Sequence, residues 1–271
     1  MPDGFAQPGH WPVQPVANFT GLAADLARAL DPVTFMAAAG IVADPWQRDV
    51  LRSPSRQLLL CCSRQAGKST VTAALATHCA LYQPGSLVLL FAPGQRQSQE
   101  LFRKVAGFYR IAGTVDPEAE SSQRLELPNG SRIVALPGNP ETVRGYSAPA
   151  LVVVDEAAFT ADELAYAVRP MLATSGGRFL ALSTPFGRRG WFFDAWDGGG
   201  DDWQRVRVTA HDCPRITPAF LESERRNLPP HRFASEYLCE FVDTEDAVFP
   251  SDLIAAAVTE RVQPLLPSFQ W

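Results

Sequence analysis

The sequence predicts an α/β fold with a mostly parallel central sheet flanked by helices. Short apolar runs at 58–61, 86–92 and 151–154 are typical of buried parallel strands. Helical segments follow the first two runs, at 71–78 and 95–111. Strands that alternate with helices along a chain favour a parallel sheet whose faces the helices cover.

The loop between the first strand and its helix contains candidate phosphate-binding residues. Its sequence is Cys62-Ser63-Arg64-Gln65-Ala66-Gly67-Lys68-Ser69-Thr70, and Lys68 is one of only two lysines in the chain. In a strand, loop and helix of this kind, backbone N–H groups and the helix N-terminus hold nucleotide phosphates. Lys68 would reach the β- and γ-phosphates, and the Ser69 hydroxyl would bind Mg²⁺. The residues from Ser63 to Thr70 are therefore candidate nucleotide ligands.

This loop departs from the usual phosphate-binding pattern at its first position. A glycine normally stands five residues before Gly67, and Cys62 occupies that position here. Cys62 must therefore adopt a backbone conformation that a Cβ allows. A chance Gly-Lys-Ser tripeptide is the alternative, but the strand before the loop and the helix after it favour phosphate binding.

An acidic pair, Asp155 and Glu156, follows the apolar strand at 151–154. Asp155 stands where a Walker-B carboxylate would hold Mg²⁺, and Glu156 could polarise a water for attack on the γ-phosphate. The alternative is a strand that ends in a solvated acidic pair. The chain between Lys68 and Asp155 is long enough for an extra strand and helix. An extra strand between Walker A and Walker B, with Glu directly after the Asp, is typical of motor-type P-loop NTPases.

Two further segments could belong to the same site. The strand expected at 178–182 ends in Ser183-Thr184-Pro185, whose hydroxyls would face the crevice at the strand ends and could sense the γ-phosphate. A plain strand end followed by a turn is the alternative. Before the first strand, the Gln47 amide could donate and accept at the adenine edge, although an ordinary amphipathic helix would look the same.

In this order, the segments resemble the ATPase domain of the large terminase subunit of tailed bacteriophages, the motor that packages DNA into proheads. The matching stretches are Trp46-Gln47-Arg48-Asp49, Ser63-Arg64-Gln65-Ala66-Gly67-Lys68-Ser69, Val143-Arg144-Gly145-Tyr146, Val152-Val153-Val154-Asp155-Glu156-Ala157, Ser183-Thr184-Pro185 and Glu236-Tyr237-Leu238-Cys239-Glu240-Phe241. They span most of the chain. A loop that starts with Ser-Arg-Gln is itself typical of terminases, so the missing first glycine fits this family.

The resemblance implies a role for each matching residue. It implies phosphate and Mg²⁺ binding by Lys68 and Ser69, metal binding by Asp155, base catalysis by Glu156, adenine binding by Gln47, and coupling of hydrolysis to movement by Ser183, Thr184 and Pro185. Arg144 falls where the family has an arginine finger, which a neighbouring subunit would supply and which is worth about 10³–10⁵ in rate in comparable NTPases. Arg64 is the competing candidate, and an ordinary surface arginine is the alternative for Arg144.

The resemblance also implies partners and a domain organisation. It implies ATP with Mg²⁺, double-stranded DNA, the prohead portal, the small terminase subunit and a homo-oligomeric ring, in the host cytoplasm and transiently at the portal. Large subunits usually carry a C-terminal nuclease, and this chain ends about where that domain should begin. Nuclease activity is therefore not expected in this polypeptide.

We expect four segments along the chain. They are a Pro-, Gly- and Gln-rich, poorly ordered segment at 1–20, an ATPase core at 21–210, a helical lid or linker subdomain at 211–250, and a linker toward the absent nuclease at 251–271.

Local patterns add several elements. Helices are expected at 22–30 and 32–39, and from 217 to 237 with a break at Pro229-Pro230. A hairpin is expected at 123–136, around the Asn129-Gly130 turn.

Composition limits the class of protein. The net charge of −5 is not that of a general nucleic-acid binder, although a motor needs only a local basic surface. Candidates for such a surface are Arg96, Arg103, Lys104, Arg188 and Arg189, and solvated surface residues are the alternative for each. There is no run of eighteen apolar residues and no signal peptide, and five cysteines without metal-type spacing indicate reduced thiols.

Two other functions share these motifs. One is half of a superfamily-two helicase, but about a hundred residues after Asp155 are too few for a second recombinase-like domain. The other is an assembly module that binds ATP and barely hydrolyses it.

Overall fold

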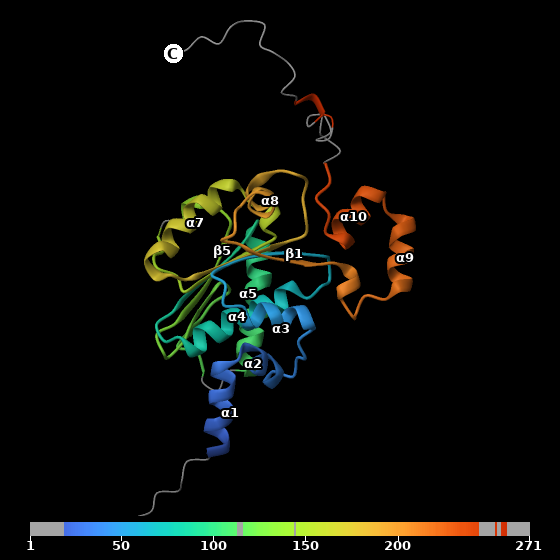
Figure 1. Cartoon of the computed structure of the whole chain (residues 1–271). Helices are drawn as coiled ribbons and strands as arrows, with labels where there is room; N and C mark the ends of the chain where they lie inside the picture. The colour runs from blue at the N-terminus through green and yellow to red at the C-terminus, as the bar shows by residue number, and fades with distance from the viewer. Residues whose placement is uncertain (1–18, 113–115, 144, 244–252, 254–255, 259–271) are drawn as a thin grey trace, which may run out of the picture.

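The structure is a computed structural model that describes residues 19–112, 116–143, 145–243, 253 and 256–258. Within these residues, eight strands form one sheet in the order β3-β4-β5-β2-β6-β7-β1-β8 (Figure 1). The strands are β1 Gln57–Cys62, β2 Leu87–Ala92, β3 Ala119–Glu120, β4 Arg124–Glu126, β5 Arg132–Pro137, β6 Leu151–Asp155, β7 Arg178–Ser183 and β8 Gln204–Val208. The poorly ordered segment predicted at 1–20 lies outside the described residues as far as residue 18, and so does most of the linker predicted at 251–271.

The predicted mostly parallel sheet is confirmed. β5, β2, β6, β7, β1 and β8 run parallel to one another, whereas β3 and β4 form an antiparallel edge beside β5. The hairpin predicted at 123–136 is the β4–β5 pair. β8 was not predicted, although its residues 205–208 alternate between polar and apolar side chains as an edge strand would.

The strand that separates β1 from β6 in space is β7. β2, which lies between the two motifs in the sequence, lies on the far side of β6. The register pairs Cys61 of β1 with Ser183 of β7, and Leu182 of β7 with Asp155 of β6. The three strands therefore end side by side, which brings their C-terminal loops to one edge of the sheet.

Helices cover both faces of the sheet (Figure 1). α2, α3, α4 and α5 pack on one face, and α7 and α8 pack on the other. These helices are α2 Pro32–Ala38, α3 Pro45–Arg52, α4 Lys68–Tyr82, α5 Gln95–Ala112, α7 Asp162–Ser175 and α8 Gly190–Asp197. The predictions of α2, α4 and α5 are confirmed, whereas α7 and α8 were not predicted.

The central strands are apolar throughout because both of their faces are covered. Successive strand residues point to opposite sides of a sheet. In β1, Leu58 and Leu60 accordingly join the core beneath α2–α5, and Leu59 joins the core beneath α7 and α8. Because side chains on both faces of each central strand are packed in a core, the end of the strand, and therefore the start of the loop that follows it, is held in place.

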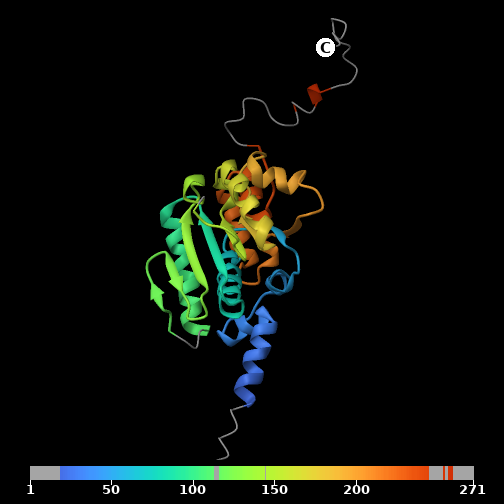
Figure 2. The same cartoon turned by 90° about the vertical axis from the view of Figure 1, so that its left-hand side faces the viewer.

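The remaining elements lie around this core. They are α1 Phe19–Leu30, α6 Pro140–Val143, η1 Ala157–Phe159, η2 Ala210–Asp212, α9 Pro218–Asn227 and α10 Pro230–Leu238. α1 projects away from the sheet in both views (Figures 1 and 2). α9 and α10, interrupted at the predicted Pro229-Pro230, form a small cluster of their own with η2 around Leu221, Phe233 and Tyr237. None of the described helices has the length and apolarity needed to cross a membrane.

We expect Phe179→Leu to lower the free energy of unfolding by about 1–2 kcal/mol, because it leaves a space in the core under β7. Phe179 is fully buried and packs against Trp191 and Trp203, with ring centroids 5.9 and 5.5 Å away. Urea unfolding measures the change. The control is Tyr166→Leu on α7, whose exposed ring should contribute less than about 0.5 kcal/mol. Equal effects of the two changes would contradict the assigned packing.

Candidate active site

The candidate phosphate-binding loop connects the C-terminal end of β1 to the N-terminus of α4, as predicted. Cys62 is the last residue of β1 and has a negative φ, so the strand geometry accommodates its Cβ. The loop makes its left-handed turns later, at Gln65 (φ 60°) and Gly67 (φ 94°). Burial raises the pKa of the Cys62 thiol, which keeps the thiol neutral.

Gly67 is required at its position for two reasons. Its φ of 94° is a conformation that side chains disfavour. A Cβ at this residue would also lie 2.8 Å from Nε2 of Gln47. The close approach of Gln47 therefore helps to set the shape of the loop directly before Lys68.

The acidic pair lies at the end of β6. Asp155 is the last strand residue, and Glu156 has φ 50° and ψ 46°, a left-handed conformation that is costly for a residue with a Cβ. The Glu156 N–H donates to Asp155 Oδ1 at 3.0 Å. This turn directs the Glu156 side chain across the end of β7 toward α4.

Lys68, Glu156 and Ser183 meet at the ends of the three adjacent strands. Lys68 Nζ lies 3.3 Å from Glu156 Oε1, and the Lys68 side chain is only 9 % exposed. Ser183 Oγ lies 3.5 Å from Glu156 Oε2. The predicted convergence of the glycine loop with the acidic pair is therefore present in the fold.

Asp155 lies in an environment that disfavours its charge. Burial, and next the negative charge of Glu156, raise the pKa of Asp155 from 3.8 to about 6, while the Lys68 ammonium partly offsets them. A carboxylate whose pKa is raised in this way would be stabilised by a cation bound beside it. The Asp155 carboxylate and the first-turn hydroxyl of Ser69 could therefore hold Mg²⁺, which prefers oxygen ligands.

The other residues of the loop differ in exposure. Ser63 and Ala66 are buried, Gln65 is exposed, and Thr70 is half-buried in the first turn of α4. The Ser63 N–H donates to the carbonyl of Val208 in β8 at 2.8 Å. The start of the loop is therefore anchored to the edge of the sheet.

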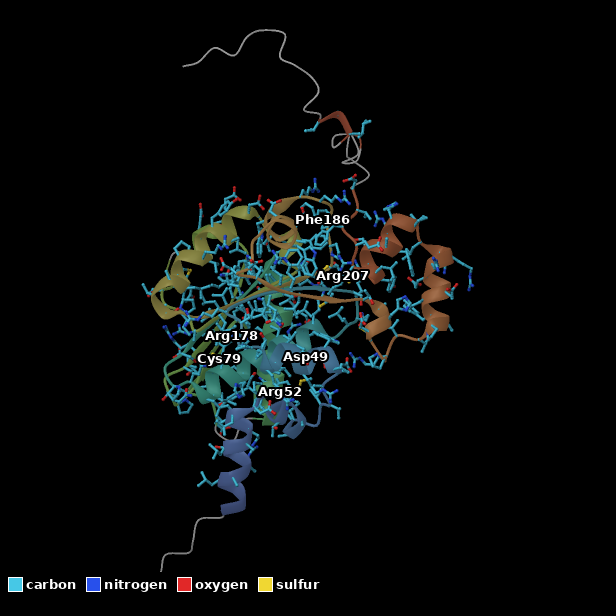
Figure 3. All side chains as sticks on the ribbon, in the orientation of Figure 1. Asp49, Arg52, Cys79, Arg178, Phe186 and Arg207 are labelled. Atoms are coloured by element: carbon cyan, nitrogen blue, oxygen red, sulfur yellow. The ribbon has the colours of Figure 1, made fainter. Side chains whose placement is uncertain are left out.

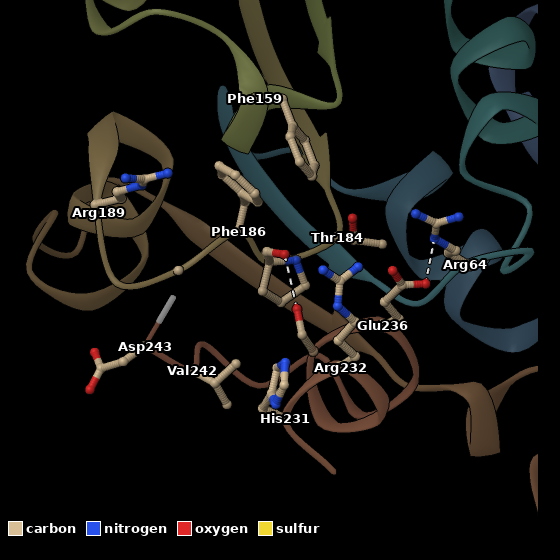
Figure 4. A pocket seen from close by; sticks show the side chains of 13 residues that line it. Arg64, Phe159, Thr184, Phe186, Arg189, His231, Arg232, Glu236, Val242 and Asp243 are labelled. Carbon is tan, nitrogen blue, oxygen red and sulfur yellow. Dashed lines mark hydrogen bonds and ion pairs between the residues drawn. The ribbon is translucent and has the colours of Figure 1, made fainter. Parts of the chain in front are cut away.

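Arg64 contacts α10. Its side chain is 62 % exposed, and its Nε lies 2.7 Å from Glu236 Oε2 on α10. The Arg64 N–H also donates to the Glu236 carbonyl at 3.1 Å. Figure 4 shows this pair beside Thr184, at the wall of a cleft of about 300 Å³ that Phe159 and Phe186 also line.

Gln47 lies against the loop rather than in an open cleft. It is 2 % exposed, and its Oε1 accepts from the Asp44 N–H at 2.9 Å, at the start of α3. Its amide nitrogen faces Gly67. Contact with adenine by Gln47 stays a prediction.

The candidate finger, Arg144, lies outside the described residues. It directly follows α6, whose last residue Val143 is buried. On either side of it, the Tyr146 N–H donates to the Val143 carbonyl at 3.1 Å. The trans role of Arg144 stays a prediction.

The candidate coupling residues connect the site to α10. Ser183 and Thr184 are buried, and the Pro185 carbonyl accepts from Ser235 Oγ at 3.0 Å. α10 thus contacts both the loop after β7 and, through Glu236, the phosphate-binding loop.

Sequence reasoning missed three charged residues around the loop: Arg215 and Glu236, which contact it, and Asp44, which pairs with Arg215. Asp44 had a local signal, since an Asp before Pro and three residues before Gln is typical of a helix N-terminus. Arg215 has no such signal, because its partners are distant in sequence. Glu236 lies within a stretch that resembles the family, but the resemblance implied no role for this residue.

The candidate DNA-contacting residues lie in two separate places. Arg96, Arg103 and Lys104 are exposed on α5, where Arg103 pairs with Glu100 at 2.9 Å. In the loop after β7, the Arg188 Nε donates to the Phe241 carbonyl at 3.2 Å, and the Arg189 guanidinium lies 5.1 Å from the centre of the Phe186 ring.

Comparisons with solved structures place this fold among the large terminases. The large terminase ATPase domain of Thermus phage P74-26 matches with a TM-score of 0.69 and 23% identity, over 78% of this chain and 99% of that one. The large terminase of a thermophilic bacteriophage, in complex with ADP, matches with a TM-score of 0.60 and 13% identity, over 74% of this chain and 54% of that one. At these identities the likeness shows the fold.

Sequence comparisons lead to the same family. The terminase large subunit of Escherichia phage T5 is 28% identical over 211 residues, covering 74% of this chain and 48% of that protein. The terminase large subunit of Thermus phage G20c is 26% identical over 255 residues, covering 79% and 52%. This chain spans about half the length of these relatives. The family of T4likevirus-type terminase large subunits, N-terminal part, matches residues 59–256, and the chain therefore belongs to this family.

Proposed function

We propose that this chain is the ATP-hydrolysing motor domain of a phage large terminase, which drives double-stranded DNA into the prohead. The observation that carries the proposal is the meeting of Lys68, Glu156 and Ser183 at adjacent strand ends. A buried lysine, a carboxylate and a hydroxyl at the mouth of a glycine loop are the groups that phosphoryl transfer to water needs.

The nucleotide phosphates would lie on the loop from Ser63 to Thr70, at the N-terminus of α4. Ser69 and Asp155 would hold Mg²⁺, and the raised pKa of Asp155 supports this because a cation would stabilise its carboxylate. When bound, Mg²⁺ neutralises charge on the β- and γ-phosphates. Gln47 would lie at the adenine side. The large terminase of the thermophilic bacteriophage has been solved with ADP and with ATP-γ-S, which supports nucleotide binding in this fold.

Lys68 and Glu156 would exchange partners when nucleotide binds. Here they pair with each other at 3.3 Å. Triphosphate in the loop would draw the Lys68 ammonium to its oxygens, because their charge exceeds that of one carboxylate. Glu156 would then be available to orient a water and accept its proton, held in place by its left-handed backbone.

Movement would be transmitted through α10. The segment 183–185 contacts α10 through Ser235, and Arg64 contacts it through Glu236. Loss of the γ-phosphate would change both contacts. We therefore retain residues 21–210 as the ATPase core and 211–250 as a lid or linker subdomain.

The proposed partners follow from the family. They are double-stranded DNA, the prohead portal, the small terminase subunit and further copies of this chain in a ring, in the host cytoplasm and at the portal. Mg²⁺-dependent phosphate release from ATP, measured with and without DNA, tests the activity. Absence of both ATP binding and phosphate release under all these conditions would refute the proposal.

Mixing of two variants tests whether Arg144 acts in trans. We expect Arg144→Ala to lose the part of the rate that rises with protein concentration, because a neighbouring copy would supply the guanidinium. Arg144→Ala mixed with Glu156→Gln should regain activity, since one copy of each then forms a complete site. Phosphate release at increasing total protein measures both effects. If Arg144→Ala keeps the full concentration dependence, Arg64 becomes the candidate to test.

A further inference from the structure

Arg215 contacts the backbone of the phosphate-binding loop. Its Nη1 and Nη2 donate to the two carboxylate oxygens of Asp44, at 3.0 and 2.8 Å. Nη2 also donates to the carbonyl of Ala66, at 3.1 Å. The Arg215 side chain is half-exposed, but the Asp44 side chain is only 10 % exposed. One guanidinium thus connects a nearly buried carboxylate to the backbone of the loop.

Asp44 is itself fixed by its position at the start of α3. Its N–H donates to Gln47 Oε1 at 2.9 Å, and the nitrogen of the same Gln47 amide lies against Gly67. A Cβ on Gly67 would lie 2.8 Å from Gln47 and 3.2 Å from Arg215 Nη2. Gln47 and Arg215 therefore lie against Gly67, and Asp44 holds Arg215 in this position.

The orientation of this peptide matters for phosphate binding. The carbonyl and the N–H of a trans peptide point in opposite directions. Because the Ala66 carbonyl points to Arg215, the Gly67 N–H points away from it. In a phosphate-binding loop the backbone N–H groups are the phosphate ligands, so the contact with Arg215 sets the direction of one of them directly before Lys68.

We propose that Arg215, held by Asp44, is a positioning residue that keeps the Ala66–Gly67 peptide in its phosphate-binding orientation. The inference rests on the proposed function of the loop. Arg215 acts through the backbone, so its effect concerns the phosphates and not the base. Its loss should weaken the binding of any nucleoside triphosphate equally.

The test is the binding of Mg·ATP and Mg·GTP to Arg215→Gln, measured by calorimetry. We expect both dissociation constants to rise by about tenfold, the size of one charge-assisted hydrogen bond at a half-exposed position. The turnover of bound ATP should change less, because Lys68 and Glu156 stay in place. Arg215→Lys should not restore binding, since one ammonium cannot hold both carboxylate oxygens and the carbonyl in a fixed fork.

Arg52→Gln is the matched control. Arg52 is 57 % exposed and pairs with both carboxylate oxygens of Asp31, at 3.2 and 2.7 Å. It lies near α1, far from Phe186 at the opposite end of the molecule (Figure 3). Both variants should lose similar thermal stability without nucleotide. Only Arg215→Gln should show a smaller rise in melting temperature with Mg·ATP, because its affinity is about tenfold weaker.

Asp44→Asn provides a second measurement with little change in shape. It should weaken binding to a similar degree, and the double variant Asp44→Asn/Arg215→Gln should be no worse than either single one. Unchanged affinity of Arg215→Gln, equal loss in Arg52→Gln, or loss for ATP alone would each overturn the inference. If the wild-type chain binds neither nucleotide, the proposed function fails and the inference fails with it.

Discussion

Replacing Glu156 with Gln should lower the turnover of ATP by about 10²–10⁴ while Mg·ATP still binds. The amide has the same shape and keeps an oxygen that can accept from Lys68, so the site should stay closed. It cannot accept a proton from water. The left-handed backbone at this position, with φ 50°, is as costly for Gln as for Glu, so the change isolates the chemistry of the carboxylate.

Two measurements separate binding from chemistry. Calorimetry with a slowly hydrolysed ATP analogue should give a dissociation constant within a few-fold of that of the wild type. The rate of phosphate release should fall by about 10²–10⁴. Glu163→Gln is the control, because Glu163 is exposed in the first turn of α7, close in sequence but outside the site. Turnover within twofold of the wild type would remove Glu156 from the role of base.

Local sequence patterns were sufficient for the parts of this site that depend on strand ends. Lys68 follows a buried strand and Asp155 ends another, and in a parallel sheet the carboxyl ends of strands lie at one edge. Their convergence could therefore be predicted without coordinates. The position of β7 between them could not, because strand order depends on long-range packing.

The residues that support the loop were beyond prediction for the same reason. Arg215 and Glu236 are about 150 residues or more from their partners, Ala66 and Arg64. Arginines are frequent in this chain, and nothing in the local sequence distinguishes Arg215 from an arginine that is merely solvated. Cys62 shows the opposite case: the absence of a glycine looked like a defect, and the strand simply extends through that position.

Replacing Asp155 with Asn should stabilise the nucleotide-free protein and abolish its response to Mg·ATP. In the fold, burial and the neighbouring Glu156 raise the pKa of Asp155 from 3.8 to about 6. A folded pKa above the unfolded one means that ionisation of Asp155 destabilises the fold. This cost is absent below pH 4, grows as the pH rises through the window from about 4 to 6, and is complete above it.

At pH 7 the Asn variant should therefore be more stable by about 1–3 kcal/mol, the upper limit being the full shift. At pH 4 the two proteins should have nearly the same free energy of unfolding. Urea unfolding at both pH values measures this convergence. Asp201→Asn is the control, because Asp201 is exposed in the loop after α8, and its replacement should change the free energy of unfolding by less than about 0.5 kcal/mol.

The nucleotide response should change in the opposite direction. A neutral amide is a weaker Mg²⁺ ligand than a carboxylate, so the rise in melting temperature with Mg·ATP should disappear in Asp155→Asn. A less stable variant at pH 7, or a stability gain that persists at pH 4, would show that Asp155 is not destabilised by its charge. Both effects together would mean that this carboxylate is kept at a cost to the fold, because the magnesium–triphosphate complex needs its charge.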